Sequence, residues 1–306
     1  MFSTEAIVEC VPNFSEGLDE RVVREIVRSM QVYGVSLLNW SMDAAHNRSV
    51  VTIAGPPEAV AEAAVRAAGV AAATIDLTRQ TGVHPRIGSA DVIPFVPVRN
   101  YTLAQCAVLA RGAAMQIWRR FGVPTYLYEA AAMRPDRVNL EDVRRGQFEG
   151  LRDAVKRDAK SRPDVGGPDL HATAGATAVG ARQFLIAYNL YLTGGEVAVA
   201  RAVAKELRAS NGGLAGVKAM GVVVEGRAQV SMNVTDFRIT PMNKVFATVE
   251  RLAKKQGVGV ESGEVIGLIP EAAYTPDAAW LRPITEFNAA ERVVERMLEL
   301  PLAWPT

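Results

Sequence analysis

The chain has 306 residues, about the length of two average domains, which is enough to bury a core without disulfide or metal support. Its 34 basic and 33 acidic residues leave a formal charge of +1, which excludes a basic footprint for nucleic acid or a polybasic membrane anchor. Cys10 and Cys106 form no CxxC pair, and no apolar run approaches the roughly 18 residues of a membrane span. We therefore expect a cytoplasmic protein that contacts neither nucleic acid nor membrane.

Hydrophobic periodicity predicts alternating strands and helices in the first half of the chain. Strands are expected over 7–11, 35–40, 50–54, 92–96 and 123–128, and helices over 19–32, 58–77 and 102–121. Pro57 suits the first turn of its helix, and Thr102 with Gln105 has the pattern of a capping box. The first six elements have the order βαββαβ, which is the ferredoxin-like arrangement, followed by an extra helix and strand and by polar helices over 139–160.

The second half repeats this element order. A Pro/Gly cluster over 161–169 is the best candidate linker, so we predict an N-terminal domain over 1–165 and a C-terminal domain over 166–306. Strands are expected over 184–192, 217–224, 228–234, 258–260 and 265–269, and helices over 242–256 and, as a tail, 285–300. Thr193 to Glu196 has the pattern of a capping box for a further helix that reaches about Ala209. The predicted class is α/β (α+β), with two βαββαβ halves.

Three polar, glycine-rich segments are candidates for chemistry, over 10–17, 81–88 and 166–180. His84 is the most suggestive residue, because Pro85 favours an extended backbone before it and Arg86 points to the same side two residues later. A neighbouring positive charge favours a neutral imidazole, which can accept a proton as a general base. The alternative is a loop histidine that caps backbone groups.

The other candidate residues give weaker signals. His46 follows a strand, but an Asx-type turn at Asp43 explains it at least as well, so only Asp43 and Arg48 are kept as candidate ligand groups. His171 alone indicates a surface residue. No HExxH motif, paired carboxylate spacing, P-loop or GxSxG elbow is present, so we expect no metal and no serine nucleophile.

Several long motifs, in order, resemble the formiminotransferase family. They are VECVPNFSEG (8–17), NRSVVTIAGPPE (47–58), GVHPRIGSADVIPFVPV (82–98), VPTYLYEAA (123–131), GATAVGARQFLIAYN (175–189) and VSMNVTDF (230–237). The resemblance implies a glutamate formimidoyltransferase of histidine degradation and one-carbon metabolism, which moves the formimino group of N-formimino-L-glutamate to N5 of tetrahydrofolate as co-substrate. It also implies a homodimer and two subdomains whose sheets face one another across a substrate groove.

Family roles transfer only to matching positions. The catalytic histidine falls on His84, and Asp43 matches an acidic position that we predict polarises the amidine. We predict that Asn13, Arg48 and Arg86 contact substrate, the arginines by holding carboxylates. The folate loop falls on Gly166, Gly167, Pro168, Asp169, Leu170, His171, Ala172, Thr173, Ala174 and Gly175, where Leu170 and Ala174 replace aromatic residues of the mammalian pattern.

Two alternatives stay open at this stage. One is a transferase of the same fold that uses another formimino or formyl donor. The other is a non-catalytic folate-binding protein, against which His84 and its neighbours Gly82, Pro85 and Arg86 argue.

Overall fold

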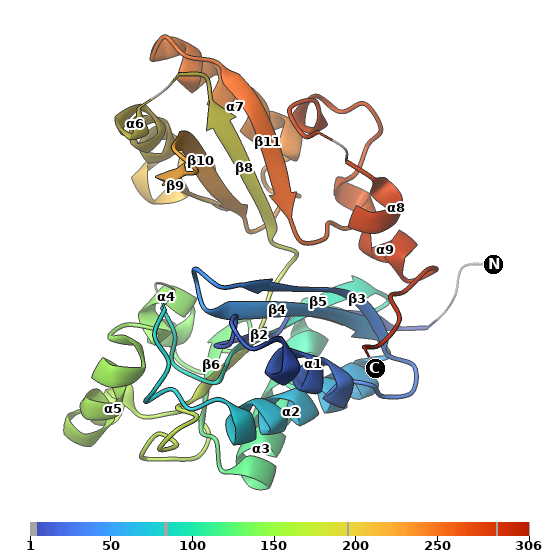
Figure 1. Ribbon diagram of the computed structural model, residues 1–306, viewed down its shortest axis with the longest axis vertical. Helices are drawn as coiled ribbons and strands as arrows, with labels where there is room; N and C mark the ends of the chain where they lie inside the picture. The colour runs from blue at the N-terminus through green and yellow to red at the C-terminus, as the bar shows by residue number, and fades with distance from the viewer. Residues whose placement is uncertain (1–4, 83–84, 195, 286, 306) are drawn as a thin grey trace. The chain divides into compact units, whose positions relative to one another are not determined.

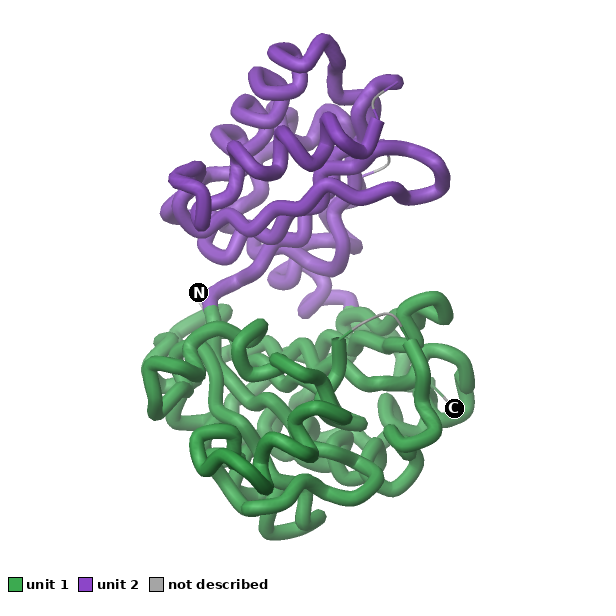
Figure 2. The backbone as a smooth tube through the Cα atoms, turned by 90° about the vertical axis from the view of Figure 1, so that its left-hand side faces the viewer, with its two compact units in different colours: residues 1–182, 301–306 green, residues 183–300 purple. Residues whose placement is uncertain are grey.

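The computed structural model describes residues 5–82, 85–194, 196–285 and 287–305. These residues form two compact units, Met1–Arg182 with Pro301–Thr306 and Gln183–Leu300 (Figure 2). The division expected at 165/166 therefore moves to 182/183. The 161–169 segment is part of the first unit, because Thr125 and Val165 hydrogen bond through their backbones there.

The part of the first unit that the structure describes forms a mixed sheet of seven strands, several of which are labelled in Figure 1. Its strands are β1 (Ile7–Cys10), β2 (Asn13–Phe14), β3 (Ser36–Asp43), β4 (Arg48–Gly55), β5 (Ala90–Arg99), β6 (Thr125–Glu129) and β7 (Thr177–Ala181). Strands β1 and β2 each pair with both β4 and β5, so they are two parts of one strand line interrupted at Pro12. The antiparallel order β3-β4-β1-β5 is that of a ferredoxin-like sheet, and β7 and β6 extend it in parallel.

The described residues of this unit form five α-helices. They are α1 (Glu20–Ser29), α2 (Pro57–Thr74), α3 (Leu103–Phe121), α4 (Leu140–Val143) and α5 (Gln147–Arg157). Both predicted helix starts are confirmed: Pro57 is the first residue of α2, and Thr102 and Gln105 form a reciprocal capping box before α3. Helices α1, α2 and α3 lie on one face of the sheet in Figure 1.

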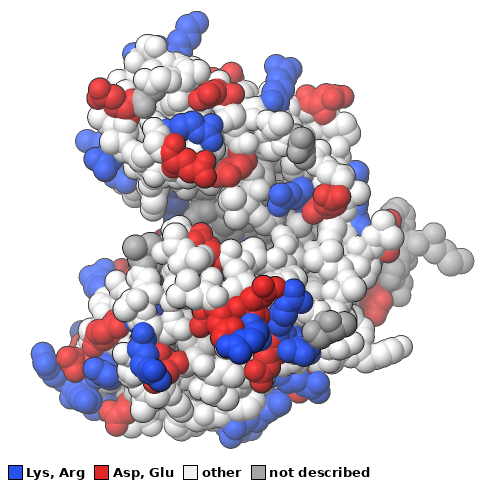
Figure 3. All heavy atoms as spheres, in the orientation of Figure 1, with Lys and Arg blue, Asp and Glu red and all other residues white. Residues whose placement is uncertain are grey.

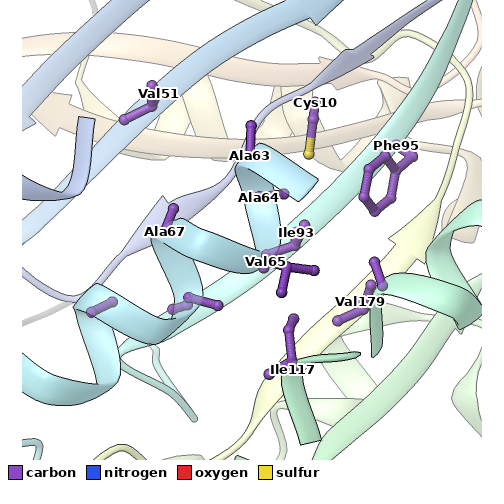
Figure 4. Close-up of a cluster of buried hydrophobic side chains, with 14 of the residues drawn as sticks. Cys10, Val51, Ala63, Ala64, Val65, Ala67, Ile93, Phe95, Ile117 and Val179 are labelled. Atoms are coloured by element: carbon purple, nitrogen blue, oxygen red, sulfur yellow. The ribbon is translucent and has the colours of Figure 1, made fainter. Parts of the chain in front are cut away.

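The core of the first unit lies between this sheet and its helices. Figure 4 shows Cys10 and Phe95 from the sheet together with Val65 of α2 and Ile117 of α3. Cys10 and Cys106 are free and buried, and burial raises the pKa of the Cys106 thiol to about 12. Both cysteines are therefore core residues, as expected from their apolar neighbours. A thiol buried in this way resists ionisation and is unreactive.

The second unit repeats the ferredoxin-like fold. It consists of β8 (Ile186–Leu192), α6 (Val197–Leu207), β9 (Val217–Val224), β10 (Arg227–Val234), α7 (Met242–Lys255), β11 (Val260–Ile266), α8 (Ala289–Arg292) and α9 (Val294–Met297). Its sheet is antiparallel throughout, in the order β11-β8-β10-β9. The α+β class with two βαββαβ halves is therefore confirmed, whereas the facing of the two sheets stays a prediction.

Four local predictions were wrong. Strand β7 was missed, because its sequence Thr-Ala-Val-Gly-Ala lacks strand-forming bulk. Thr193 does not cap α6, since its Oγ1 accepts the Gly259 N–H at 2.8 Å and Glu196 is the N-cap residue. The two strands expected over 258–269 are the single β11, and the tail helix is divided into α8 and α9 by extended backbone at Val293 (φ −105°, ψ 123°).

The surface mixes charges of both signs. On the face shown in Figure 3, acidic and basic side chains are interspersed. Among the described residues, none of the helices has the length and hydropathy to cross a bilayer.

Candidate active site

One pocket of the first unit gathers residues that are far apart in the sequence. It is lined by Ser15, His46, Asn47, Arg48, Gln80, Thr81, Gly82 and Arg86. These residues come from the segment after β2, from the β3–β4 turn and the first residue of β4, and from the segment before β5. Two of the three polar segments singled out in the sequence, 10–17 and 81–88, thus meet at this pocket. Val83 and His84 lie outside the described residues, between the pocket residue Gly82 and Pro85.

The β3–β4 turn presents Asp43, His46 and Arg48. Asp43 Oδ1 accepts the His46 backbone N–H at 3.0 Å, and Asp43 Oδ2 lies 2.7 Å from His46 Nδ1. These two bonds hold the pKa of Asp43 below its ordinary value, and the bond from the His46 backbone N–H has the larger effect. The side-chain-to-backbone turn predicted at Asp43 is therefore present, but His46 also lines the pocket, which the sequence did not indicate.

A network of amides and one carboxylate fixes the turn to its neighbours. Asn47 has a left-handed backbone (φ 48°), and its Oδ1 accepts the Gly17 N–H at 2.9 Å while its Nδ2 donates to Thr81 O at 2.9 Å. Asn47 Nδ2 also donates to Gln80 Oε1, and Gln80 Nε2 donates to Glu16 Oε2 at 2.8 Å. Gly17 is required for this approach, because a Cβ there would lie 2.3 Å from a backbone oxygen of the turn. The network therefore holds three segments in one arrangement around the pocket.

Arg48 is held by Asn13 and Asp91. Its Nε and Nη2 donate to Asn13 Oδ1 at 3.0 and 2.6 Å, and its Nη1 donates to Asp91 Oδ2 at 3.1 Å. Arg144 Nη2 donates to the same oxygen of Asp91. Burial lowers the pKa of Arg48 to about 10, with Arg144 acting in the same direction and Asp91 opposing, so the guanidinium stays charged at neutral pH. Of the predicted substrate-binding residues, Arg48 lines the pocket and Asn13 is bonded to it, whereas the sequence gave no indication of Asp91 and Arg144.

Arg86 makes bonds to protein groups rather than pointing freely into the pocket. Its Nη2 donates to Gln80 O at 2.7 Å, to Leu77 O at 3.4 Å and to Glu149 Oε1 at 2.9 Å. Its own carbonyl accepts the Phe148 N–H at 2.8 Å. Arg86 therefore connects the segment before β5 to helix α5. Its position two residues after His84 in the sequence did not indicate this structural role.

The expected folate loop, 166–175, lies against the 87–89 backbone. His171 and Gly175 exchange two backbone hydrogen bonds, and His171 Nδ1 accepts the Ala174 N–H at 3.0 Å. Gly175 is essential to this approach, because its φ is 71° and a Cβ would lie 2.1 Å from Ile87 O. The Gly167–Pro168 peptide bond is cis.

The loop residues differ in how available they are to a ligand. Gly166, Pro168, Asp169 and Ala172 are exposed, whereas Ala174 and Gly175 are buried. Leu170 packs against the core of the unit. A ligand on this loop would therefore meet its first half and Ala172 more readily than its end. Among the described residues, no group of three or more His, Cys, Asp and Glu side chains is placed to hold a metal ion.

Two ferredoxin-like units, the first with a polar pocket built from three loops, define the class as a two-subdomain α+β protein. The profile described as "Formiminotransferase domain, N-terminal subdomain" matches residues 7–182, and the one described as "Formiminotransferase domain" matches residues 187–297. The chain belongs to the formiminotransferase family.

Named relatives cover nearly the whole chain. A glutamate formimidoyltransferase of Streptococcus pyogenes serotype M1 is 41% identical over 95% of this chain and 98% of that protein. A glutamate formimidoyltransferase of Thermoplasma acidophilum is 38% identical over 96% and 98%. The formimidoyltransferase-cyclodeaminase of Mus musculus is 37% identical over 90% of this chain but only 52% of its own length. The similarity to the mouse protein therefore covers about half of that protein.

Proposed function

We propose that this chain is a glutamate formimidoyltransferase. It moves the formimino group from N-formimino-L-glutamate to N5 of tetrahydrofolate, which is its co-substrate, and releases L-glutamate. The observation that carries the proposal is the match to two proteins of that name along 98% of each of their lengths. The polar pocket of the first unit supports it, because it is lined by Arg48, one of the arginines expected to hold a carboxylate.

The chemistry needs one group that can both accept and donate a proton. N5 of the folate attacks the amidine carbon, and a tetrahedral intermediate forms as the carbon–nitrogen double bond becomes single. The attacking nitrogen loses a proton, the glutamate nitrogen gains one, and the bond from carbon to that nitrogen breaks. We assign both transfers to His84, acting first as base and then as acid, a role worth about 10²–10⁴-fold in rate.

The remaining groups orient the two substrates. We assign the polarisation of the amidine to Asp43, which is bonded to His46, and the binding of a donor carboxylate to Arg48, which is bonded to Asn13 and Asp91. Arg86 contributes by holding the loop before β5 to α5. The exposed first half of the 166–175 loop is assigned to the folate. Fixing two reactants in this way supplies up to about 7–11 kcal/mol of the barrier reduction.

The decisive experiment incubates the purified chain with N-formimino-L-glutamate and tetrahydrofolate. The expected result is equal amounts of L-glutamate and of a folate product that cyclises in acid and is detected by its absorbance. A panel that includes formiminoglycine and N-formyl-L-glutamate tests the donor, and faster transfer from either of those would replace the donor named here. Folate binding without product from any donor would establish the non-catalytic alternative instead.

The family resemblance also leads us to propose a cytoplasmic homodimer that acts in histidine degradation. Sedimentation equilibrium at several protein concentrations tests the assembly, and a monomer throughout would refute it.

A further inference from the structure

A chain of side-chain hydrogen bonds joins the pocket to a buried carboxylate. Asn47 Nδ2 donates to Gln80 Oε1, and Gln80 Nε2 donates to Glu16 Oε2 at 2.8 Å. Of these three described residues, Asn47 and Gln80 line the pocket, whereas Glu16, which is only 6% exposed, does not. Gln80 and Asn47 therefore connect the Glu16 side chain to the pocket.

The direction of this chain is fixed at Asn47. Asn47 Oδ1 accepts the backbone N–H of Gly17 at 2.9 Å, and Asn47 Nδ2 donates to the backbone carbonyl of Thr81 at 2.9 Å. Because a backbone N–H can only donate and a carbonyl can only accept, the side-chain amide of Asn47 has one orientation in which both contacts are hydrogen bonds. Its NH2 group then faces Gln80, which must present an oxygen to it.

The direction is also fixed at Glu16. Glu16 Oε1 accepts the backbone N–H groups of Leu18 and Asp19, just before α1, at 2.7 and 2.9 Å. An amide at position 16 would keep its oxygen on these groups and would present its NH2 group to Gln80. Whichever way the Gln80 amide is turned, one NH2 group would then meet another, and an unpaired buried donor is costly. A carboxylate, which accepts at both oxygens, satisfies both ends of the chain.

Asn47 is the residue through which this chain affects the shape of the pocket. It lies in the β3–β4 turn between His46 and Arg48, and all three residues line the pocket. Its backbone is left-handed (φ 48°), a conformation that residues other than glycine adopt only when their surroundings favour it. The turn also lies directly against Gly17, where a Cβ would overlap the Arg48 backbone nitrogen. The side-chain bonds of Asn47 therefore help to determine the conformation of the turn.

We infer that Glu16 is a positioning residue for the donor site, which acts through Gln80 and Asn47 to keep the β3–β4 turn in the arrangement that lines the pocket. The inference rests on the proposed function, which assigns this pocket to the amino-acid donor, and it extends the site to a residue outside the lining. The negative charge of Glu16 is used here to set the direction of a hydrogen-bond chain, and Glu16 itself does not touch substrate.

The test exchanges the carboxylate and the amide. Glu16→Gln should raise the KM for N-formimino-L-glutamate about tenfold, because a mispaired buried amide displaces the turn, while kcat and the KM for tetrahydrofolate change by less than about threefold. The double variant Glu16→Gln/Gln80→Glu moves the carboxylate to position 80, where one oxygen accepts from Asn47 and the other from the new amide at position 16. Every hydrogen bond then keeps its direction, so the donor KM should return to within about threefold of the wild-type value.

Two further variants complete the set. Gln80→Met removes both bonds of the Gln80 side chain without a change of charge, and should raise the donor KM as Glu16→Gln does, so it also decides the question if Glu16→Gln does not fold. Tyr126→Phe is the matched control, because the buried Tyr126 hydroxyl donates to Ser161 O at 2.7 Å in the same unit and does not line the pocket. This control should lower thermal stability and leave both KM values unchanged.

The outcomes separate this inference from the proposed function. A wild-type donor KM in Gln80→Met or Glu16→Gln would overturn the inference, as would a double variant that is no better than Glu16→Gln, or an equal rise in both KM values. Calorimetric binding of L-glutamate, which needs no turnover, should weaken in the single variants and recover in the double variant. If the wild type binds L-glutamate and shows this order but transfers nothing, the proposed function alone is overturned. A wild type that does not bind L-glutamate would overturn the inference.

Discussion

The two units have the same strand order, but their fourth strands, β5 and β11, differ in how deeply they are buried. In the first unit β5 has partners on both sides, β1 and the added β7, and its first seven residues are buried. In the second unit the corresponding β11 pairs with β8 on one side and is largely half-exposed. The addition of two parallel strands thus converts an outer strand into an inner one, and a carboxylate on it then needs charged partners.

Each fourth strand contains a carboxylate that shows this difference. Asp91 in β5 is bound by two arginines. Glu264 in β11 accepts the amide groups of Asn189 and Gln229, both at 3.0 Å. The position in the fold is therefore similar, but only the inner strand requires an ion cluster, and that cluster adjoins the candidate site.

The largest expected effect comes from removing these two carboxylates. Asp91→Ala should lower the free energy of unfolding of the first unit by about 3–5 kcal/mol, because two buried arginines lose their counter-charge. Glu264→Ala should cost about 1 kcal/mol in the second unit, where only neutral donors lose an acceptor. Hydrogen exchange in urea, resolved by unit, measures both values. Equal losses at the two positions would contradict the contrast drawn between the strands.

The next largest effect is on turnover, since we assign the catalytic group to the first unit. His84→Asn should reduce turnover at least about 100-fold, since the proton-transfer group is lost, while folate binding and the fold are retained. The measurement is kcat together with circular dichroism and folate titration. A variant that retains near-normal turnover would remove His84 from the mechanism.

Arg86→Leu should affect stability as well as binding. The sequence alone predicted mainly a loss of substrate affinity, but the carbonyls and the carboxylate bound by Arg86 add a stabilising contribution of about 1–3 kcal/mol. Glu149→Gln is the control, and should cost less than about 1 kcal/mol because Glu149 is exposed. Thermal unfolding and donor KM together separate the two roles. A raised KM with unchanged unfolding temperature would restore the original prediction.

The smallest effect lies in the second unit and depends on pH. Hydrogen bonds from Arg238 hold the pKa of Asp236 below its ordinary value of 3.8. A lowered folded-state pKa stabilises the fold above the ordinary value, and this contribution is lost as the pH falls through the folded-state value. Asp236→Asn should therefore destabilise by less than about 1 kcal/mol near neutral pH, and the difference should vanish below the lowered pKa. A difference that stays constant across an acid titration of the unfolding free energy would count against this ion pair.

Much of the fold could be predicted because its signals are local. The strands predicted over 217–224 and 228–234, the capping box at Thr102 and the proline that opens α2 each depend on a few neighbouring residues, and all of them are present. Strand β7 gave no such signal, since its small residues become a strand only between β5 and β6. The predicted boundary at 165/166 differs from the observed one at 182/183 because β7, which lies between these two positions, was not recognised as a strand of the first sheet.

The candidate site was only partly predictable. Asn13, Arg48 and Arg86 stand in polar motifs and could be proposed as candidates from the sequence. Gln80 and Glu16 are joined by a side-chain hydrogen bond between positions 64 residues apart, which no local pattern indicates. Arg144 reaches Asp91 across 53 residues, and nothing in its own neighbourhood distinguishes it from the adjacent Arg145, which pairs with Asp142 at the surface. A lone aspartate at the start of an apolar strand was the one signal available for this cluster.

The backbone contact between Leu302 and Leu37 has a consequence for the order in which the chain can fold during synthesis. The Leu302 N–H donates to Leu37 O at 2.8 Å, on the edge strand β3, and Trp304 packs against the core of the first unit. The second unit is therefore an insertion within the first, entered after Arg182 and left before Pro301. During synthesis the bond between Leu302 and the edge strand β3 can form only after the more than one hundred residues of the second unit have been made, so β3 lacks this contact until then.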